Sequence, residues 1–547
     1  MSARMNRGKR SAPRIAAVMH RDTTPSSAGA AALLAAAALA LALSSWGAAA
    51  QASVGPGCQT IAGHGSARSG ATGSWPFPNG NVANTRDAAG SRISSSNIGK
   101  LAQVWAFKLT GKATTGVKPY GALTANPIIE DGIVYIQDLD SDVYALSLAN
   151  GKLVWEYRCD QPEKSGPGPN GVAVSGGRVY GLTPTASFAL NARNGRELWV
   201  NSGLLHRGEG TFGIQPQAVG GRVYIASQYG SGAGGGVLMA LSAQTGKLLW
   251  RFATLTGPDP GVKALGVGGG GAWETPLVGA DGSVTYGIGN PYQTPDAAIA
   301  EPARLLYTDS DVNLDAATGK LHWYFQAVPN DFKDYDLQTS PIATEAGGTA
   351  VLLASGKMGY VYELNASTGK LLWKVPVGRH NGHDNDSLNA LEHHSTIRAP
   401  LTILPGSLGG VLTNLAVADN SVYVATLDVP LTYASLKLPL ATKGTGVASG
   451  EVEALNLTTG KVEWDRKLAQ LPLGAITVSN DLILTTLYGG ELLALNRSTG
   501  ASVFERRLPA ATNSPIAVAG KTVVVPAGAP TTTTGRRNPQ VVAYAVP

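Results

Sequence analysis

The stretch MALSAQTGKLLW, residues Met239–Trp250, contains the pattern that decides the fold. An apolar strand comes first, a Thr-Gly pair follows, and a second run ends on a tryptophan. The Thr-Gly pair supplies the positive backbone angle that a short hairpin needs. Apolar and polar residues alternate before it, as in a half-buried strand. The stretch therefore predicts a strand, a tight turn and a second strand.

The same pattern occurs seven times with constant internal spacing. The second residue of the strand precedes the aromatic residue by ten positions in Ala145/Trp155, Ala189/Trp199, Ala240/Trp250, Asn313/Trp323, Glu363/Trp373, Ala454/Trp464 and Ala494/Phe504. The gaps between copies vary in length. A fixed unit with variable connections is typical of a repeat architecture.

Most copies are preceded by a further strand that begins at Gly or Asp-Gly, such as DGIVYI at Asp131–Ile136. Four strands per unit without a convincing helical stretch indicate a β-propeller, in which each tryptophan would pack between neighbouring blades. Trp105 precedes the first full copy, and the chain ends in the strand Val541–Val546. We therefore expect an all-β, eight-bladed propeller. Its N- and C-terminal strands would share one blade and leave no open sheet edge.

The chain is expected to have three parts: an export signal in residues 1–52, a lead-in segment in residues 53–95 and the propeller in residues 96–547. Basic residues precede the apolar run Ala28–Leu43, and small residues near Ala50 offer a cleavage site. This run is shorter than the ~20 residues of a spanning helix, and an uncleaved anchor is the alternative. We expect a periplasmic or secreted protein.

The charge balance of the chain does not indicate nucleic-acid binding. The formal net charge is +6, but six basic residues and one acid lie within residues 1–52, which leaves 37 basic and 36 acidic residues in the remainder. A nucleic-acid-binding domain normally carries a concentrated positive surface.

The only two cysteines are Cys58 and Cys159. In an oxidising compartment they would join and close a loop of about 100 residues, worth up to ~4–5 kcal/mol in the chain-entropy model. Two unpaired buried thiols are the alternative. The sequence has no Cys-x-x-Cys-His motif, which excludes a covalently attached haem in this chain.

Function is expected where the chain departs from the repeat, because propellers host many activities. GGGGAWETPLVGADGSVTYGIGNPY (Gly268–Tyr292) lies in a long gap between copies, and VPNDFKDYDLQTSP (Val328–Pro341) follows the fourth copy. These stretches resemble the quinoprotein alcohol dehydrogenases. Three further stretches are similar to the same family: Ser74–Trp105, Ala354–Lys370 and Leu404–Val424. The resemblance implies a secreted eight-bladed propeller that holds pyrroloquinoline quinone (PQQ) and a metal ion on its axis.

The resemblance also implies roles for five residues. Trp273 falls where the family stacks an indole under the quinone, and Lys357 falls at the basic residue that contacts the quinone oxygens. Asn290 and Asp334 fall at metal ligands, with Asp334 also at the catalytic base. Asp336 adds a second carboxylate, at the position where members that use a lanthanide carry an acid. The implied metal is Ca²⁺ or a lanthanide.

These residue types suit the implied chemistry. A planar anionic ring favours a flat apolar face and a nearby cation. A hard metal ion favours oxygen ligands and acts as a Lewis acid, while a neighbouring carboxylate takes the alcohol proton. The resemblance implies a dehydrogenase that oxidises an alcohol, polyol or sugar hydroxyl and passes electrons to a separate acceptor such as a cytochrome.

Three departures from the family affect the binding half of the site. The family's glutamate ligand is missing from Ala226–Ser242, where Ser231 is nearest to its place. The region Cys159–Val174 lacks the family's adjacent cysteines and the arginine after them, and an early glutamate is replaced around Thr124. Loss of an anionic ligand weakens a divalent site, and Asp336 is expected to compensate.

Each site residue also has a structural explanation when it is taken alone. Trp273 could be one more packing tryptophan, Asn290 an ordinary turn residue, Asp334 and Asp336 solvated loop acids, and Lys357 a surface lysine. Their joint order and spacing favour the functional interpretation.

Two alternatives stay open for the chain as a whole. One is a non-catalytic propeller that binds protein or envelope components, like outer-membrane assembly lipoproteins built from similar repeats. The other is a degenerate former enzyme. The stretch RHNGHDNDSLNALEHHS, Arg379–Ser395, has irregular spacing, and a polar surface loop is expected there rather than a metal site.

Overall fold

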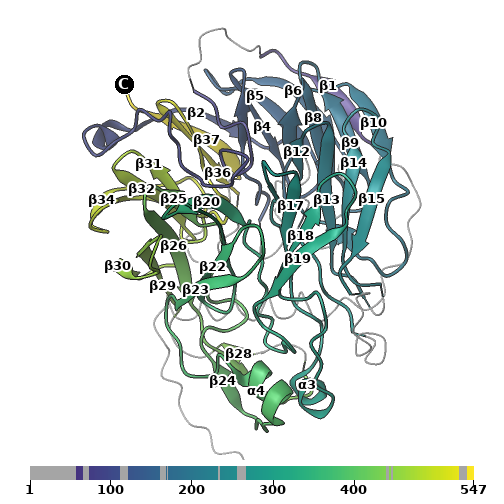
Figure 1. Ribbon diagram of the computed structural model, residues 1–547. Helices are drawn as coiled ribbons and strands as arrows, with labels where there is room; N and C mark the ends of the chain where they lie inside the picture. The colour runs from purple at the N-terminus through teal and green to yellow at the C-terminus, as the bar shows by residue number, and fades with distance from the viewer. Residues whose placement is uncertain are drawn as a thin grey trace, which may run out of the picture.

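The chain forms a closed ring of eight antiparallel sheets, the blades of a β-propeller (Figure 1). The computed structural model describes residues 57–65, 73–110, 121–159, 168, 170–231, 234–255, 267–438, 443–444, 448–528 and 539–547. The predicted export signal, residues 1–52, lies outside the described residues. The eight sheets confirm the predicted all-β propeller. Blades are numbered below from 1 to 8 in chain order.

Each of the first four blades has its innermost strand first and its outermost strand last. Blade 1 contains β3 (Ile128–Glu130), β4 (Ile133–Gln137), β5 (Val143–Ser147) and β6 (Leu153–Arg158). Blade 2 contains β7 (Ala173–Ser175), β8 (Arg178–Leu182), β9 (Ser187–Asn191) and β10 (Glu197–Asn201). Blade 3 contains β12 (Gln217–Val219), β13 (Arg222–Gln228), β14 (Val237–Ser242) and β15 (Leu248–Ala253), with β11 (Thr211–Phe212) beside β13. Blade 4 contains β16 (Leu277–Val278), β17 (Ser283–Gly287), β18 (Ser310–Asp315) and β19 (Leu321–Gln326).

The other four blades complete the ring. Blade 5 contains β20 (Ile342–Ala346), β21 (Thr349–Ser355), β22 (Tyr360–Asn365) and β23 (Leu371–Pro376). Blade 6 contains β25 (Ala416–Ala418), β26 (Ser421–Asp428), β29 (Ser449–Asn456) and β30 (Val462–Leu468). Blade 7 contains β31 (Thr477–Ser479), β32 (Leu482–Leu487), β33 (Glu491–Asn496) and β34 (Ser502–Arg507). Blade 8 joins β35 (Ala517–Ala519), β36 (Thr522–Ala527) and β37 (Gln540–Ala545) to β2 (Ala102–Lys108) from the start of the chain.

The constant spacing of the repeat has a direct structural cause. In blade 3, Ala240 and Trp250 are ten residues apart and lie opposite each other in the antiparallel pair of β14 and β15. The Trp250 indole Nε1 donates a hydrogen bond to the carbonyl of Ala316 in the next blade. The same bond to the following blade is made by Trp105, Trp155, Trp199, Trp323, Trp373 and Trp464. The repeated tryptophan thus joins each of these blades to its neighbour.

The turn glycine of each repeat serves this junction. Gly369 has φ +67°, and a Cβ atom added there would lie 2.3 Å from the Trp323 ring of the preceding blade. The positive angle and the contact with the indole both favour glycine.

The segment 75–88 lies on the ring axis. Each innermost strand has one free edge, and the segment hydrogen-bonds to residues of several of them, including Ile129 of β3, Ala343 of β20 and Val417 of β25. Arg86 is fully buried and donates to the carbonyls of Ile476 and Ile516. The segment therefore satisfies backbone groups that would otherwise face an open channel.

The first described residues are tied to blade 1. The short strand β1 (Gln59–Ala62) pairs with β6 as a fifth strand. Cys58 and Cys159 form a disulfide between positions 101 residues apart in the sequence. Of the two interpretations of the cysteines, the structure therefore has the bonded pair.

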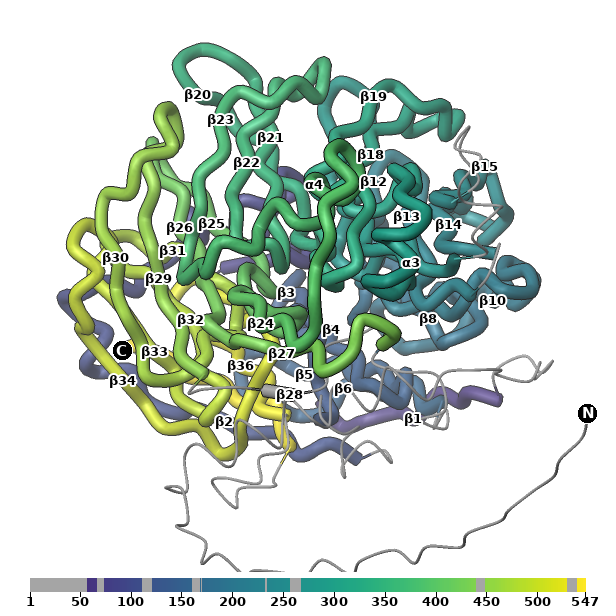
Figure 2. Tube along the Cα trace, turned by 90° about the horizontal axis from the view of Figure 1, so that it is seen from below, coloured from purple at the N-terminus to yellow at the C-terminus, as the bar shows by residue number. Residues whose placement is uncertain are grey.

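Insertions between the second and third strands of blades 4 and 6, and in the connection from blade 5 to blade 6, form a cap at one end of the ring (Figures 1 and 2). It contains the elements α3 (Pro295–Ala300), α4 (Asp386–His393), β24 (Leu401–Ile403), β27 (Leu431–Tyr433) and β28 (Lys443–Gly444). Besides these, a short 3-10 helix, η1 (Ile98–Lys100), precedes β2. The helices were not expected from the sequence, because each is too short to give a clear period. Within the described ranges, none of the helices has the length and apolar character to cross a bilayer.

Candidate functional site

The five predicted site residues lie in connections that emerge at one end of the ring. Trp273 precedes β16 and Asn290 follows β17, while Asp334 and Asp336 lie between β19 and β20 and Lys357 lies between β21 and β22. In an antiparallel blade, the connection from the second to the third strand and the connection to the next blade leave from the same end. The topology therefore brings all five together at the end where the cap lies.

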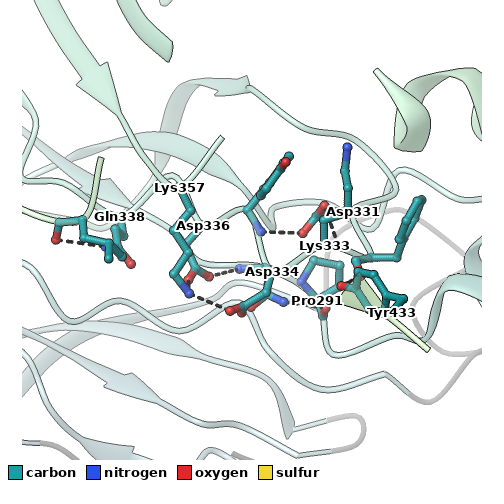
Figure 3. Close-up of polar contacts among 12 residues, drawn as sticks. Pro291, Asp331, Lys333, Asp334, Asp336, Gln338, Lys357 and Tyr433 are labelled. Carbon is teal, nitrogen blue, oxygen red and sulfur yellow. Dashed lines mark hydrogen bonds and ion pairs between the residues drawn. The ribbon is translucent and has the colours of Figure 1, made fainter. Parts of the chain in front are cut away.

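Lys357 joins the two acids in a compact ionic contact (Figure 3). Its Nζ lies 2.7 Å from Oδ2 of Asp334 and 2.5 Å from Oδ2 of Asp336. All three side chains are at least 90% buried. A buried ammonium between two carboxylates is the charge arrangement that a low-dielectric site requires.

Asn290 and Trp273 complete the assembly around Gly289. The backbone N–H of Asn290 donates to Oδ1 of Asp336 at 2.8 Å. A Cβ added at Gly289 would lie 2.6 Å from Cη2 of Trp273 and 2.7 Å from Oδ1 of Asp336. The indole and the carboxylate thus flank the same glycine, and the predicted residues form one cluster.

The electrostatics of the cluster follow from burial and charge. Burial raises the pKa of Asp334 to about 8, although the Lys357 ammonium opposes this shift. Burial acts against the charge of Lys357, but the carboxylates of Asp334 and Asp336 outweigh it and raise the pKa of the amine. Lys357 therefore stays protonated at neutral pH, next to the carboxyl group of Asp334, whose pKa is about 8.

A hydrogen-bonded chain connects Glu274, next to Trp273, with the segment 75–88 on the ring axis. Glu274 follows Trp273, and its Oε2 accepts a hydrogen bond from Nδ2 of Asn414 at 2.8 Å. The same amide nitrogen donates to Oδ1 of Asn79 at 3.3 Å. Burial raises the pKa of Glu274 to about 7, against the effects of Asn414 and the Arg86 charge. The cluster therefore rests on a polar network along the axis.

The departures from the family lie near the indole. Asn170 donates to the carbonyl of Trp273 at 3.4 Å and accepts from the Thr124 hydroxyl at 2.9 Å. Ser231, at the place of the missing glutamate, is exposed, and its backbone N–H donates to Gly208. Of these positions, the pair of Thr124 and Asn170 thus reaches the backbone of Trp273.

The predicted donor set for a metal consists of two carboxylates and one amide. Among the described residues, no group of three or more His, Cys, Asp or Glu side chains is arranged to hold an ion. The predicted set of Asn290, Asp334 and Asp336 differs from such a group because its third member is an asparagine. Its oxygen donors are of the kind that Ca²⁺ and other hard cations bind.

Several polar residues beside the cluster were not predicted from the sequence. Lys333 is fully buried beside Asp334, and His380 contacts the turn after Lys357. Asp309 is also fully buried, and burial together with Asp331 and the site acids raises its pKa well above the usual value. Residues 328–340 are buried without interruption, so no alternation in the sequence marks Lys333, and no sequence period marks His380.

The stretch Arg379–Ser395 is the expected polar surface segment, but it is not only a loop. It includes α4, and its first residues reach the loops that carry Asp334 and Lys357. The stretch is polar and exposed or half-buried, as predicted, with only Ser387 and Ala390 buried, and among the described residues it forms no group that could hold a metal. What the sequence did not predict is the helix and the bonds to the two site loops.

The chain matches known protein families in two parts. Residues 75–174 and 206–380, together half of the chain, match the family described as "Glucose/ethanol/alcohol dehydrogenase, beta-propeller domain". Residues 448–544 match the family described as "Outer membrane protein assembly factor BamB".

Individual relatives agree with the larger match. Quinohemoprotein alcohol dehydrogenase ADH-IIG of Pseudomonas putida is 30% identical over 314 residues, which cover 51% of this chain and 42% of that protein. The solved structure of quinohemoprotein alcohol dehydrogenase from Comamonas testosteroni has a TM-score of 0.72 at 21% identity, covering 87% of this chain and 81% of that one. A europium-containing methanol dehydrogenase has a TM-score of 0.70 at 19% identity, covering 87% and 98%.

The sequence matches to curated relatives extend over about half of those proteins, 42% and 48% for the first two. The solved structures support the fold alone. The match over half of the chain shows the family: this protein belongs to the glucose/ethanol/alcohol dehydrogenase β-propeller family.

Proposed function

We propose that this chain is a periplasmic PQQ- and metal-dependent dehydrogenase that oxidises an alcohol, polyol or sugar hydroxyl. The observation that carries the proposal is the cluster in which Lys357 joins Asp334 and Asp336 while Trp273 and Asn290 meet Asp336 around Gly289. A scaffold has no evident need for two buried acids, a lysine and an indole at one end of its axis.

The residues fit a hard metal ion. Asp334 and Asp336 present carboxylate oxygens to the same point, where Lys357 now supplies the positive charge. Asn290 would add its amide oxygen to this set. Two carboxylates in place of one favour a highly charged ion, so the proposal covers a lanthanide as well as Ca²⁺. Metal and ammonium would share the two acids.

The residues also fit a flat anionic quinone. The half-buried indole of Trp273 supplies an apolar face of the kind that a planar ring stacks on. Lys357 supplies a cation for a carboxylate or quinone oxygen. PQQ, when bound, would supply the hydride acceptor.

The chain's own residues would perform the remaining chemistry. Asp334 would accept the hydroxyl proton of the substrate, and its burial provides the raised proton affinity that a general base needs. Lys357 would hold the carboxylate in place. Asp336 accepts from the backbone N–H of Asn290, and the side-chain amide of Asn290 donates to the carbonyl of Pro291 at 3.1 Å, which orients its oxygen.

The proposed electron acceptor is a separate protein such as a cytochrome. This sequence has no Cys-x-x-Cys-His motif to bind its own haem. Relatives in the same family are named quinohemoprotein alcohol dehydrogenases, and another is named lupanine 17-hydroxylase [cytochrome c]. These names support haem-linked electron transfer as the class of acceptor reaction.

Reconstitution tests the proposal directly. Purified protein is incubated with PQQ and with Ca²⁺, La³⁺ or Eu³⁺, and reduction of an artificial dye is measured with ethanol, glycerol and glucose. The Asp334→Asn variant is expected to lose activity by at least about 100-fold, because the proton acceptor is removed. Its circular dichroism and melting curve are expected to show a folded ring.

Glu345→Gln provides the matched control. Glu345 is an exposed acid in β20, close in sequence to Asp334 but outside the cluster. This variant is expected to keep full activity. An Asp334→Asn protein with unchanged turnover would contradict the proposed role.

A scaffold in the cell envelope is the second candidate, because residues 448–544 match the BamB family. It predicts a protein that binds no quinone with any of the three metals but forms a stable complex with an envelope protein. Quinone absorbance that co-elutes with the protein in gel filtration would contradict this candidate.

A further inference from the structure

Lys333 links the loop of Asp334 to the cap. Its side chain is fully buried and points away from the carboxylate of Asp334 (Figure 3). Its Nζ donates to the carbonyls of His383 and Asp384 at 2.5 and 3.1 Å. The ammonium also lies 4.5 Å from the centre of the Tyr335 ring. Two carbonyls and an aromatic face stabilise the buried charge.

His380 links the turn of Lys357 to the same part of the cap. Its Nε2 lies 3.1 Å from the carbonyl of Gly359, two residues after Lys357. Its Nδ1 lies 2.6 Å from Oδ1 of Asp384. The imidazole also packs edge-on against Tyr360. Asp384 therefore belongs to both links, because its carbonyl accepts from Lys333 and its carboxylate pairs with His380.

The backbone of the Asp334 loop needs such support. Asp334 has φ +62°, a left-handed conformation that is unfavourable for a non-glycine residue. On its other side, Tyr335 donates its N–H to Asp331 and its hydroxyl to the carbonyl of Pro405. Asn330 donates to the carbonyl of Ser387 in α4 at 3.3 Å. Neighbours on both sides thus fix Asp334 against the cap.

We propose that residues 379–386, named here the clamp segment, position Asp334 and Lys357 relative to each other. The two residues come from different connections of blades 4 and 5, and bonds to the clamp segment are made from the Asp334 connection by Lys333 and from the Lys357 connection by the carbonyl of Gly359. The clamp segment touches both through Lys333 and His380. Lys333 and His380 are positioning residues in this proposal, which rests on the proposed dehydrogenase function.

The first arm of the test measures turnover of the reconstituted protein. Lys333→Met keeps the length of the side chain and removes both hydrogen bonds to the clamp segment. It is expected to lower kcat by about 10- to 100-fold, because a displacement of about 1 Å at a catalytic group costs up to that much. The KM for the alcohol is expected to stay within about threefold, because the substrate contacts are unchanged. Lys333→Arg keeps a cation that can reach a carbonyl and is expected to restore part of kcat.

A double variant tests whether both links act through one segment. His380→Phe keeps the ring against Tyr360 and removes its two hydrogen-bonding nitrogens. We expect it to lower kcat, and we expect the loss in the double variant with Lys333→Met to be smaller than the product of the single losses. Lys374→Met is the matched control. Lys374 is exposed in β23, outside the clamp segment and both site loops, and its ammonium lies 5.3 Å from the centre of the Tyr360 ring, so kcat is expected to be unchanged.

The second arm uses the metal- and quinone-free protein and separates the two proposals. Hydrogen–deuterium exchange is expected to be faster in residues 331–336 and 356–359 of Lys333→Met and His380→Phe, and unchanged in Lys374→Met. If the wild type reduces no dye with any metal, the proposed dehydrogenase function fails while this arm still decides whether the clamp exists. The clamp proposal is overturned if Lys333→Met keeps the wild-type kcat. It is also overturned if the loss of kcat equals the loss of folded protein, or if exchange in both loops is unchanged.

Discussion

At the scale of single residues, Lys357 is the position on which the charge balance of the site depends. Its ammonium is buried between Asp334 and Asp336, and both contacts are within 2.7 Å. Removing one partner from a buried ionic group leaves the opposite charges without compensation. The lysine therefore stabilises the metal-free fold as well as the proposed site.

The Lys357→Met variant is expected to lose about 3–5 kcal/mol of unfolding free energy without metal, the cost of breaking a buried ion pair. Ca²⁺ or La³⁺ is expected to restore part of this loss, because a metal ion would replace the missing positive charge. Urea unfolding with and without metal measures both effects. Lys370→Met, at an exposed turn of the same blade, is the control. Equal stabilities of Lys357→Met with and without metal would contradict the predicted metal site.

At the scale of elements, the hairpin turn of each repeat combines two demands on glycine. Gly369 has a positive φ and also lies against the Trp323 ring. Gly347 has φ +55° but meets no atom closer than 3.9 Å. The two positions therefore separate the cost of the backbone angle from the cost of the blade contact.

We expect Gly347→Ala to lower the unfolding free energy by about 1 kcal/mol, the cost of a left-handed alanine. We expect Gly369→Ala to lower it by about 1–3 kcal/mol more, because the added methyl overlaps the indole. Urea unfolding, with tryptophan fluorescence as the signal, measures both. If the two variants lose the same amount, the tryptophan contact contributes nothing to blade packing.

The clamp segment gives a pH-dependent contribution to stability. Burial opposes a charge on His380, but its hydrogen bond and ion pair with Asp384, together with two backbone carbonyls, raise the pKa of the imidazole above 6.5. Tyr360 also packs against the imidazole of His380, and the Lys374 ammonium lies 5.3 Å from the centre of the Tyr360 ring. The folded protein thus binds this proton more tightly than the unfolded chain.

The contribution of His380 is therefore complete below about pH 6.5 and decreases as the pH rises through the raised pKa of the folded state. Urea unfolding of the wild type and of His380→Phe between pH 6 and 9 measures it. The difference in unfolding free energy between the two proteins is expected to shrink with rising pH. A constant difference would mean that His380 is neutral in the folded protein.

At the scale of the whole molecule, the repeat made the fold predictable. The ten-residue spacing places Ala240 opposite Trp250, and each copy carries the same pair, so blade number and ring closure follow from counting. The topology also places the connections of Trp273 and Lys357 at one end. Residues outside the repeat were less predictable, because no period constrains them.

The structure of the cap could not be predicted from the sequence. The helix α4 has only eight residues, and its polar composition is typical of a solvent-exposed loop. Lys333 and His380 act through bonds to backbone carbonyls, which leave no mark on residue pattern or spacing. Asn290, Asp334 and Asp336 were found through resemblance, and their contacts with Lys357 and Gly289 required the three-dimensional arrangement.

The segment on the ring axis, residues 75–88, determines the side from which substrate would reach the proposed enzyme's site. Residues 75–88 occupy the middle of the ring, with Arg86 buried among the innermost strands. The bonds from this segment to several innermost strands therefore occupy the ring axis and leave the capped side as the proposed approach to the cluster. Alcohol, aldehyde and electron acceptor would then all reach the cluster from the capped side. Release of the aldehyde would therefore limit how soon the acceptor or the next alcohol can bind.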